Sequence, residues 1–226
     1  MNLRKVIRKI LNENQSSNIS SKELQGLTVI ADNDITVTIK QSDYNAMIEF
    51  LEPVTRNSSS RKVIAKFSFI KDHEMYDSCL DAFITDGTWI KPKYRRMGLG
   101  AVLYSLALET AGKSGLTGDR YDVSSDAIRM WKYYSKNSNV KVKQLDVMTS
   151  SGKDFLTPTK FDDCNPTSTI EYMGGDWDED EDMYGNQSYW GNQGFKEKYK
   201  NSPLSKVYYK SDRAITQYLE ARISYI

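Results

Sequence analysis

The amino-acid sequence predicts an α+β fold, with one mostly antiparallel central sheet flanked by helices. Segments that are β-branched, or that alternate apolar and polar residues, recur in the first half of the chain. Later segments carry apolar residues at helical spacing. This mixture of strands and helices suits a single sheet with helices packed against it.

Each predicted element depends on a local pattern. Strands are expected at residues 27–31, 35–39, 63–70, 80–90, 140–147 and 206–209. Helices are expected at residues 44–51, 99–111, 126–135 and 212–223. We expect Asp32-Asn33-Asp34 to join the first two strands as a hairpin. Asp86-Gly87 is expected to interrupt the 80–90 strand by a bulge or a tight turn.

Four parts of the chain are expected to differ in organisation. Residues 1–21 predict a short basic amphipathic helix and a polar linker, and residues 22–149 the core domain. Residues 150–200 predict an irregular insertion with an acidic loop, and residues 201–226 a strand and a helix that complete the domain. The first helix suits either packing on the domain or contact with a membrane surface or a protein partner.

Charge is unevenly distributed along the chain. The formal net charge is only +1, which argues against a general attraction to nucleic acid. Seven acidic residues and no basic residue lie between Glu171 and Asp182. Without those seven, the rest of the chain holds 23 acidic and 31 basic residues, a formal charge of +8. A basic body of this kind suits an anionic ligand, and the acidic run suits either a solvated loop or a cationic acceptor.

Cysteine and histidine are too scarce for several classes of site. The chain has two cysteines, Cys79 and Cys164, and one histidine, His73. These numbers argue against a disulfide framework and a multi-histidine metal centre, so no metal site is expected. No signal peptide and no long apolar run is apparent, so we expect no membrane span and a cytoplasmic location.

The most informative local feature is a basic, glycine-containing turn that opens an apolar helix. Pro92 ends a predicted strand, Arg95 and Arg96 follow, and Gly98 and Gly100 lead into the helix. The first amides of a helix have no partner inside it, and the helix dipole adds positive charge there. A phosphate group is therefore the expected ligand. Glycine lets an oxygen approach the backbone closely, and arginine supplies charge and forked donors.

Two other kinds of phosphate-binding loop do not fit. A Walker loop needs Lys and Ser or Thr after its last glycine, whereas Gly100 is followed by Ala101. The dinucleotide fingerprint needs a third glycine where Leu103 stands.

The turn resembles the coenzyme-binding motif of the GNAT acetyltransferase superfamily, Arg/Gln-x-x-Gly-x-Gly/Ala, through Arg95, Gly98 and Gly100. The resemblance covers roughly residues 27–147 and implies a GNAT-like sheet with acetyl-CoA as co-substrate. The combination of this domain with a long polar insertion is also similar to GNAT-like proteins of tailed bacteriophages, which would place the chain in a host cytoplasm or a virion. The coenzyme-binding residues that the resemblance implies are Ile90, Arg95, Arg96, Met97, Gly98, Leu99, Gly100 and Ala101.

A later helix resembles the GNAT helix that carries a tyrosine beside the thioester. Trp131 follows Ala127 at the position of that tyrosine, which in the family can protonate the departing thiolate. Indole is a poor acid, so Tyr134, one turn further on the same face, is the expected substitute. The alternative is that Trp131 and Tyr134 are core aromatics.

Acetyl transfer to an amine also needs a group that accepts the amine's proton. Asp86, nearest the bend of the strand before the turn, is the first candidate, and its alternative is an ordinary turn residue. Asp81, Glu74 and His73 are further candidates.

Two classes of function follow from the resemblance. The first is an acetyl-CoA-dependent N-acetyltransferase that acts on a small-molecule or protein amine. The second is a GNAT fold with weak or no catalysis, used as a structural or interaction module and contacting a protein partner through the first helix or the 150–200 insertion. Transfer of another acyl or aminoacyl group would use the same fold.

Overall fold

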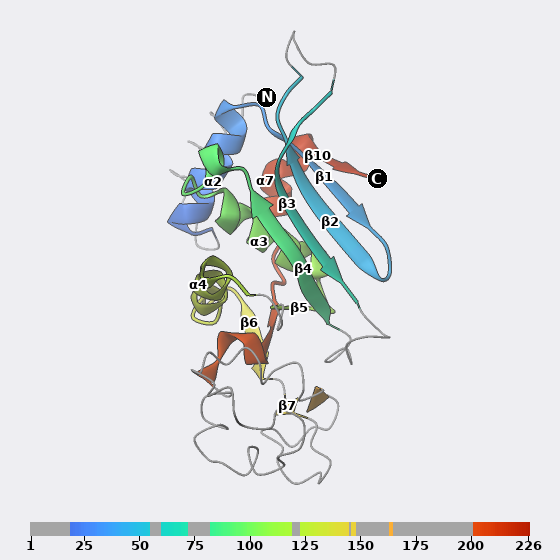
Figure 1. Ribbon diagram of the computed structural model, residues 1–226, viewed down its shortest axis with the longest axis vertical. Coiled ribbons are helices and arrows are strands. Elements are labelled where there is room, and N and C mark those ends of the chain that lie inside the picture. The colour runs from blue at the N-terminus through green and yellow to red at the C-terminus, as the bar shows by residue number, and fades with distance from the viewer. Residues whose placement is uncertain are drawn as a thin grey trace, which may run out of the picture. The chain divides into compact units, whose positions relative to one another are not determined.

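The computed structural model describes residues 19–54, 60–71, 82–118, 123–144 and 201–226, and the backbone of residues 146–147 and 163–164 (Figure 1). The chain divides into two compact units. The first comprises Met1–Ile70, Thr85–Lys113 and Tyr209–Ile226, and the second comprises Lys71–Ile84 and Ser114–Tyr208. The predicted helix near the N-terminus, the acidic run and His73, Glu74 and Asp81 lie outside the described residues.

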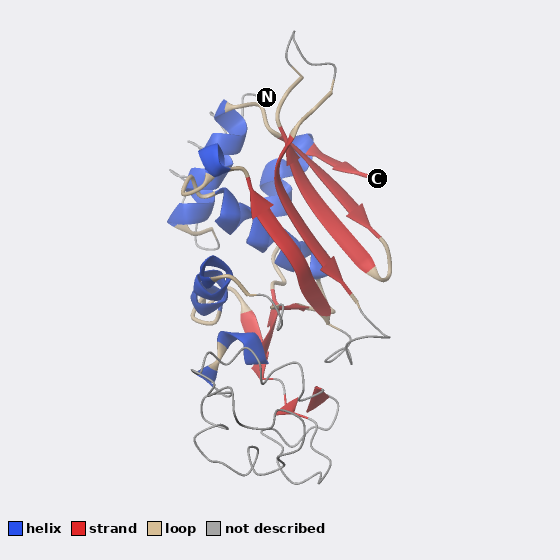
Figure 2. Ribbon diagram, viewed as in Figure 1, coloured by secondary structure: helices blue, strands red, loops and turns tan. Residues whose placement is uncertain are grey.

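The fold is mixed α+β, as the sequence predicts (Figure 2). The strands are β1 (Thr36–Gln41), β2 (Asn45–Leu51), β3 (Val63–Ile70), β4 (Phe83–Ile90), β5 (Leu116–Thr117), β6 (Lys141–Gln144), β7 (Asp146–Val147), β8 (Asp163–Cys164), β9 (Lys206–Tyr209) and β10 (Ile223–Tyr225). The helices are α2 (Ser21–Asp32), α3 (Leu99–Ala111), α4 (Ser125–Tyr134) and α7 (Ala214–Leu219), with 3₁₀ turns η3 (Pro92–Tyr94), η5 (Pro203–Ser205) and η6 (Glu220–Arg222). No helix in the described ranges is long and apolar enough to cross a membrane.

Hydrogen bonds join eight strands in the order β10-β1-β2-β3-β4-β5-β9-β6, and β7 pairs with β8 separately. The pairs β1/β2, β2/β3 and β5/β9 are antiparallel, whereas β1/β10 and β4/β5 are parallel. The ladder between β4 and β5 covers only Phe83 and Ile84 of the eight residues of β4. The rest of β4, from Thr85 to Ile90, belongs to the first unit.

In the first unit, one face of the sheet is apolar and covered by helices, as Figure 1 shows for α2, α3 and α7. Ala46, Ile48 and Phe50 of β2 are buried and alternate with more exposed residues. The central helix α3 packs against β3, α2 and α7, and most of its residues are buried. Its Tyr104 meets Phe67 of β3 edge-to-face, with ring centroids 4.8 Å apart. A helix apolar on most sides is expected where several elements surround it.

The expected strand at 27–31 is wrong, because this segment belongs to α2. Ser20 and Glu23 form a capping box: the Glu23 amide donates to Ser20 Oγ at 3.2 Å, and the Ser20 amide donates to Glu23 Oε2 at 2.6 Å. Leu27 and Ile30 are buried and lie on the apolar face of this helix. From sequence alone a short apolar run fits either a strand or a helix, and the capping box at Ser20 and Glu23 decides for the helix here. The hairpin expected at residues 32–34 is therefore absent.

The expected helix at 44–51 is also wrong, because this segment is β2. Ser42 does bond the amides of Tyr44 and Asn45, at 3.3 and 3.1 Å, as a helix cap would. Here those bonds close the hairpin between β1 and β2, in which Gln41 pairs with Ala46. The alternating burial that follows fits a strand with one buried face.

Elsewhere the predicted elements agree closely with the structure. The strands 63–70 and 206–209 and the helix 99–111 have the predicted bounds, and α4 is displaced by one residue, with Ser124 as its cap. The predicted 80–90 strand begins at Phe83. The predicted 140–147 strand is divided into β6 and β7. The predicted C-terminal helix is shorter than expected, because the chain passes through η6 and pairs as β10 with β1.

The strand β4 runs from Phe83 to Ile90 without the expected interruption at Asp86-Gly87, although the direction of its side chains changes phase along the strand. Phe83 and Thr85 are buried at alternate positions. Ile90 also faces α3, since its Cδ1 lies 3.5 Å from where a Cβ on Gly100 would be. The shift from odd to even positions is what a bulge produces. Trp89 therefore points to the opposite face, where 46% of it is exposed.

The second unit is held by an aromatic core of its own. Trp131 of α4 stacks on Tyr208 of β9, with ring centroids 4.9 Å apart. Tyr208 Oη donates to the Pro203 carbonyl at 2.6 Å, and burial raises the pKa of this phenol above its usual range. Gly118 lies so close to this core that an added Cβ would meet Trp131 Nε1 at 2.9 Å.

Candidate functional site

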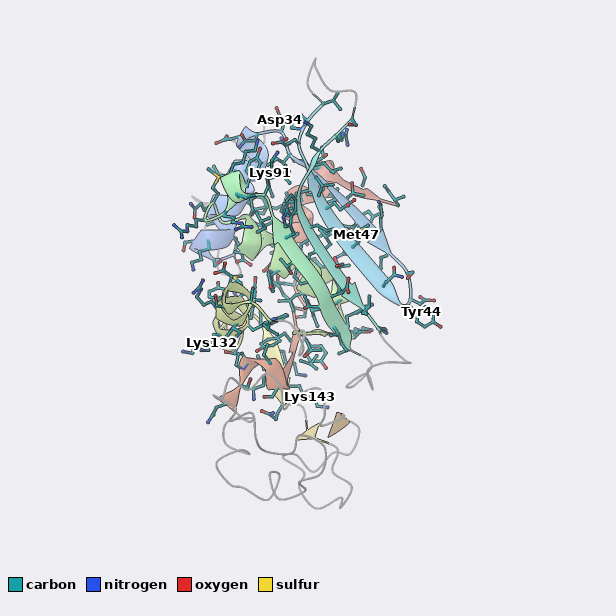
Figure 3. All side chains as sticks on the ribbon, in the orientation of Figure 1. Asp34, Tyr44, Met47, Lys91, Lys132 and Lys143 are labelled. Atoms are coloured by element: carbon teal, nitrogen blue, oxygen red, sulfur yellow. The ribbon has the colours of Figure 1, made fainter. Side chains whose placement is uncertain are left out.

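The glycine turn has the strand–turn–helix form that the sequence predicts, and it lies wholly within the first unit. The amide of Lys91, labelled in Figure 3, donates to the Ile64 carbonyl at 2.8 Å and ties the end of β4 to β3. The chain then makes the 3₁₀ turn η3, in which the Arg95 amide donates to the Pro92 carbonyl at 3.2 Å. Arg96 to Gly98 complete the turn before α3 begins.

The backbone at the start of α3 forms a concave group of amides. Gly98 is left-handed, with φ 81° and ψ −7°, and Leu99 after it is helical. A left-handed residue followed by a right-handed one points successive N–H groups into a common anion-binding hollow. Within the described part of the chain, no acceptor bonds the amides of Leu99 and Gly100; the first helical bond is Val102 N–H to the Gly98 carbonyl at 3.3 Å. These two amides are therefore open donors at the positive end of the helix.

The two arginines of the turn differ in the contacts that they make. Arg95 Nε donates to the Ile90 carbonyl at 3.0 Å, so part of its guanidinium closes the end of β4. Arg96 is exposed and has no partner among the described residues. Its φ of 63° is unusual for a side-chain-bearing residue and costs about 1–2 kcal/mol. Such strain often marks a functional turn, so Arg96 is the stronger candidate for an anion contact.

The two glycines of the motif are required for different reasons. An added Cβ on Gly98 would lie 2.4 Å from the Lys22 carbonyl and 2.6 Å from the Gly26 nitrogen, both in α2. A Cβ on Gly100 would meet only Ile90 Cδ1, at an ordinary 3.5 Å. Gly98 is thus explained by the packing of α2, whereas packing does not require Gly100. Glycine inside a helix costs about 0.5–1 kcal/mol relative to alanine, so a close ligand would explain its presence.

We expect Gly98→Ala to destabilise the protein by about 2–3 kcal/mol, because it adds both a left-handed Cβ and a clash with α2. Gly100→Ala is the matched control and should raise the free energy of unfolding by about 0.5–1 kcal/mol. Urea denaturation of both variants measures the difference. Equal stabilities would contradict the assignment of Gly98 to helix packing.

Gly26 was not predicted as part of this site. It lies in the interior of α2, and an added Cβ there would lie 2.5 Å from the Gly98 carbonyl oxygen. The backbones of α2 and the turn therefore touch directly. A glycine at a buried helical position is the one sequence signal of this contact.

The expected proton-transfer residues fall in different units. Asp86 lies on the exposed face of β4 in the first unit, and its Oδ2 accepts a bond from Ser68 Oγ at 2.8 Å. Tyr134 lies in the second unit, fully buried, with its ring 5.1 Å from that of Tyr133. Tyr133 is half-buried, and Asn137 Nδ2 donates to its hydroxyl at 3.5 Å. Trp131 is 1% exposed, in keeping with a core aromatic.

The described ranges contain no group of three or more His, Cys, Asp or Glu residues able to hold a metal ion.

The chain was also compared with known proteins. No protein-family model, no curated protein and no solved structure gives a significant match.

Proposed function

We propose that this chain is a GNAT-type acyltransferase that binds acetyl-CoA at the glycine turn and transfers its acetyl group to an amine. The observation that carries the proposal is left-handed Gly98 at the start of α3, followed by the amides of Leu99 and Gly100, which no acceptor bonds within the described residues. Backbone of this kind at a helix N-terminus suits a pyrophosphate, and Arg96, which has no partner among the described residues, adds a positive charge. The motif resemblance supplies the identity of the coenzyme.

The residues proposed to hold the coenzyme are those of the turn and its flanks. They are Ile90, Arg95, Arg96, Met97, Gly98, Leu99, Gly100 and Ala101. Ile90 would act through packing, since its side chain lies against the first turn of α3. Met97 is 41% exposed and could cover the ligand.

The proposed reaction is attack of a neutral amine on the thioester carbonyl. The C–S bond breaks as the new C–N bond forms, the amine loses a proton, and the thiolate of CoA gains one. Asp86 is the proposed acceptor of the amine's proton, directly or through water. For the donor to the thiolate, Tyr134 stays the candidate that the sequence resemblance suggests, since a phenol has a pKa near that of a thiol.

Isothermal titration of the whole chain with acetyl-CoA, beside desulfo-CoA and free adenosine, tests the binding proposal. We expect saturable binding of both coenzyme forms and much weaker binding of adenosine, which lacks the pyrophosphate. No heat with either coenzyme form would overturn the proposal.

Tyr134→Phe should lower the rate of acetyl transfer by about ten- to a thousandfold, because it removes one proton donor while keeping the ring. Tyr133→Phe is the matched control and should leave the rate nearly unchanged. Both are measured as release of free CoA with a panel of amines, beside the melting temperature. The opposite result would move the role to Tyr133, whose hydroxyl is the more exposed of the two.

A second candidate function is an interaction module that keeps the coenzyme pocket without catalysis. The burial of Trp131 and Tyr134 favours it, because both side chains serve the core of the second unit. Coenzyme binding with no transfer to any amine of the panel would support this alternative and end the enzyme proposal.

A further inference from the structure

The turn that carries Arg95 and Arg96 is anchored from outside the motif. Tyr94, the last residue of η3, is only 8% exposed, and its hydroxyl donates to Glu52 Oε1 at 2.8 Å. Glu52 follows directly after β2 and is itself fixed, since its amide donates to the Lys62 carbonyl at 2.9 Å. The turn is therefore bonded to a neighbouring strand pair.

Glu52 also binds the two lysines that flank this turn. Lys93 Nζ forms a close ion pair with Glu52 Oε1, and Lys91 Nζ lies 3.7 Å from Oε2. Lys93 additionally lies over the ring of Tyr94, 4.6 Å from its centroid. Hydrogen bonds from Lys93 and Tyr94 lower the pKa of Glu52, so the carboxylate is ionised at neutral pH.

These contacts distinguish the lysines around the glycine turn from Arg96. The Glu52 carboxylate pairs with Lys91 and Lys93, whereas Arg96 has no partner in the part of the chain that the structure describes. The same carboxylate fixes the ring immediately before the arginines. The amides proposed to bind phosphate begin only five residues after Tyr94, at Leu99, so the position of η3 governs the path of the chain into them.

We infer that Glu52 is a positioning residue for the anion site, acting through Tyr94 to hold the glycine turn in its binding conformation. This inference rests on the proposed function. Glu52 touches no ligand itself. Its carboxylate lies near an anion site, so electrostatics alone would make it unfavourable for binding. Positioning and electrostatics therefore predict opposite signs for its removal.

Three variants separate the two effects in the whole chain. Glu52→Leu removes both the acceptor for Tyr94 and the charge, Glu52→Gln removes the charge but keeps an acceptor, and Tyr94→Phe removes the hydroxyl but keeps the ring. Glu49→Leu is the matched control, because Glu49 lies in β2 three residues before Glu52, is also paired with a lysine, Lys40, and has the same side-chain exposure of 17%.

Affinity is measured by titration with ADP and with acetyl-CoA, which share a pyrophosphate. We expect Glu52→Leu and Tyr94→Phe to weaken both by about tenfold, since each loses a hydrogen bond to a charged group. Glu52→Gln should bind as well as the parent chain or more tightly, and Glu49→Leu should bind normally. Amide hydrogen exchange of residues 93–98 without ligand should accelerate in Glu52→Leu and Tyr94→Phe only.

Tighter binding by Glu52→Leu, or binding equal to that of Glu49→Leu, would overturn the inference. The coenzyme proposal is judged separately by the parent chain and by Gly100→Glu. If the parent binds neither ligand, the proposal and the inference fall together. If the parent binds, Gly100→Glu abolishes binding and Glu52→Leu does not weaken it, the inference alone falls.

Discussion

Replacing Gly100 by glutamate should abolish acetyl-CoA binding while leaving the protein folded. Gly100 is the second residue of α3, and a Cβ there meets nothing closer than 3.5 Å. Helical side chains point back toward the N-terminus, so a glutamate at this position reaches the open amides that a pyrophosphate would use. Juxtaposed like charges cost several kcal/mol, so affinity should fall by about a hundredfold or more.

The free energy of unfolding of the Gly100→Glu variant should rise, although its affinity falls. A carboxylate in the first turn of a helix gains about 0.3–1 kcal/mol from the helix dipole, and loss of glycine adds a similar amount. Gly100→Gln separates volume from charge, and Gly100→Ala should bind normally because the GNAT motif that this turn resembles accepts alanine at this position. Titration and thermal unfolding of the three variants are the measurements. A stable Gly100→Glu protein with unchanged affinity would remove the turn from the coenzyme site.

The parts of the fold that could be predicted are those specified by nearby residues. The helix α3 and its turn follow from Pro92, the two glycines and an apolar run within a short stretch of chain. The same holds for α4, whose cap Ser124 bonds the Ala127 amide at 3.2 Å. Local signals of this kind act independently of the rest of the fold.

Two elements were wrongly predicted because their local sequence patterns fit both a helix and a strand. The apolar run at 27–31 and the serine before 44–51 each fit both a helix and a strand. Pairing decided the second case, because β2 lies between β1 and β3. A single sequence contains no direct record of such pairing.

The strand–turn–helix form of the candidate site was predictable from the sequence, but the residues that support it were not. The arginines and glycines are adjacent in sequence, whereas Gly26 and Glu52 are brought to the turn only by folding. The sequence also could not distinguish Gly98, needed for helix packing, from Gly100, which packing does not require. Both are glycines in one motif, and only the neighbouring helix separates their roles.

A buried ionic cluster is also formed only by folding and could not be predicted from the sequence. It joins α2, α3 and the C-terminal segment of the first unit. Lys210 is 4% exposed, and its Nζ lies 2.9 Å from Glu109 Oε1 and 3.9 Å from Glu23 Oε1. Glu109 also accepts bonds from the amides of Ile215 and Thr216, at 3.0 and 2.8 Å, and so caps α7 from another helix. The ammonium thus compensates two buried carboxylates.

Lys210→Met should therefore lower the free energy of unfolding by about 3–5 kcal/mol, because it leaves two buried carboxylates without a cation. Lys40→Met is the matched control: Lys40 pairs with Glu49 at 3.5 Å but is 45% exposed, so its loss should cost at most about 1 kcal/mol. Urea denaturation measures both variants. Equal losses would show that the cluster contributes no more than a surface pair.

A double variant and a pH series identify the cause of the loss. Adding Glu109→Gln to Lys210→Met should recover part of the stability, because the single amide oxygen can still accept a bond from α7 and no charge is left buried at this position. Burial by itself lowers the pKa of Lys210, but Glu109, Glu23 and Asp212 more than offset this and raise it above its usual value. The stabilisation is therefore fully present below the ordinary lysine pKa and is lost only as the pH rises through the raised one. A parent chain that loses this stability between pH 6 and 8, on the scale of about 3 kcal/mol, would contradict a charged Lys210 at the centre of the cluster.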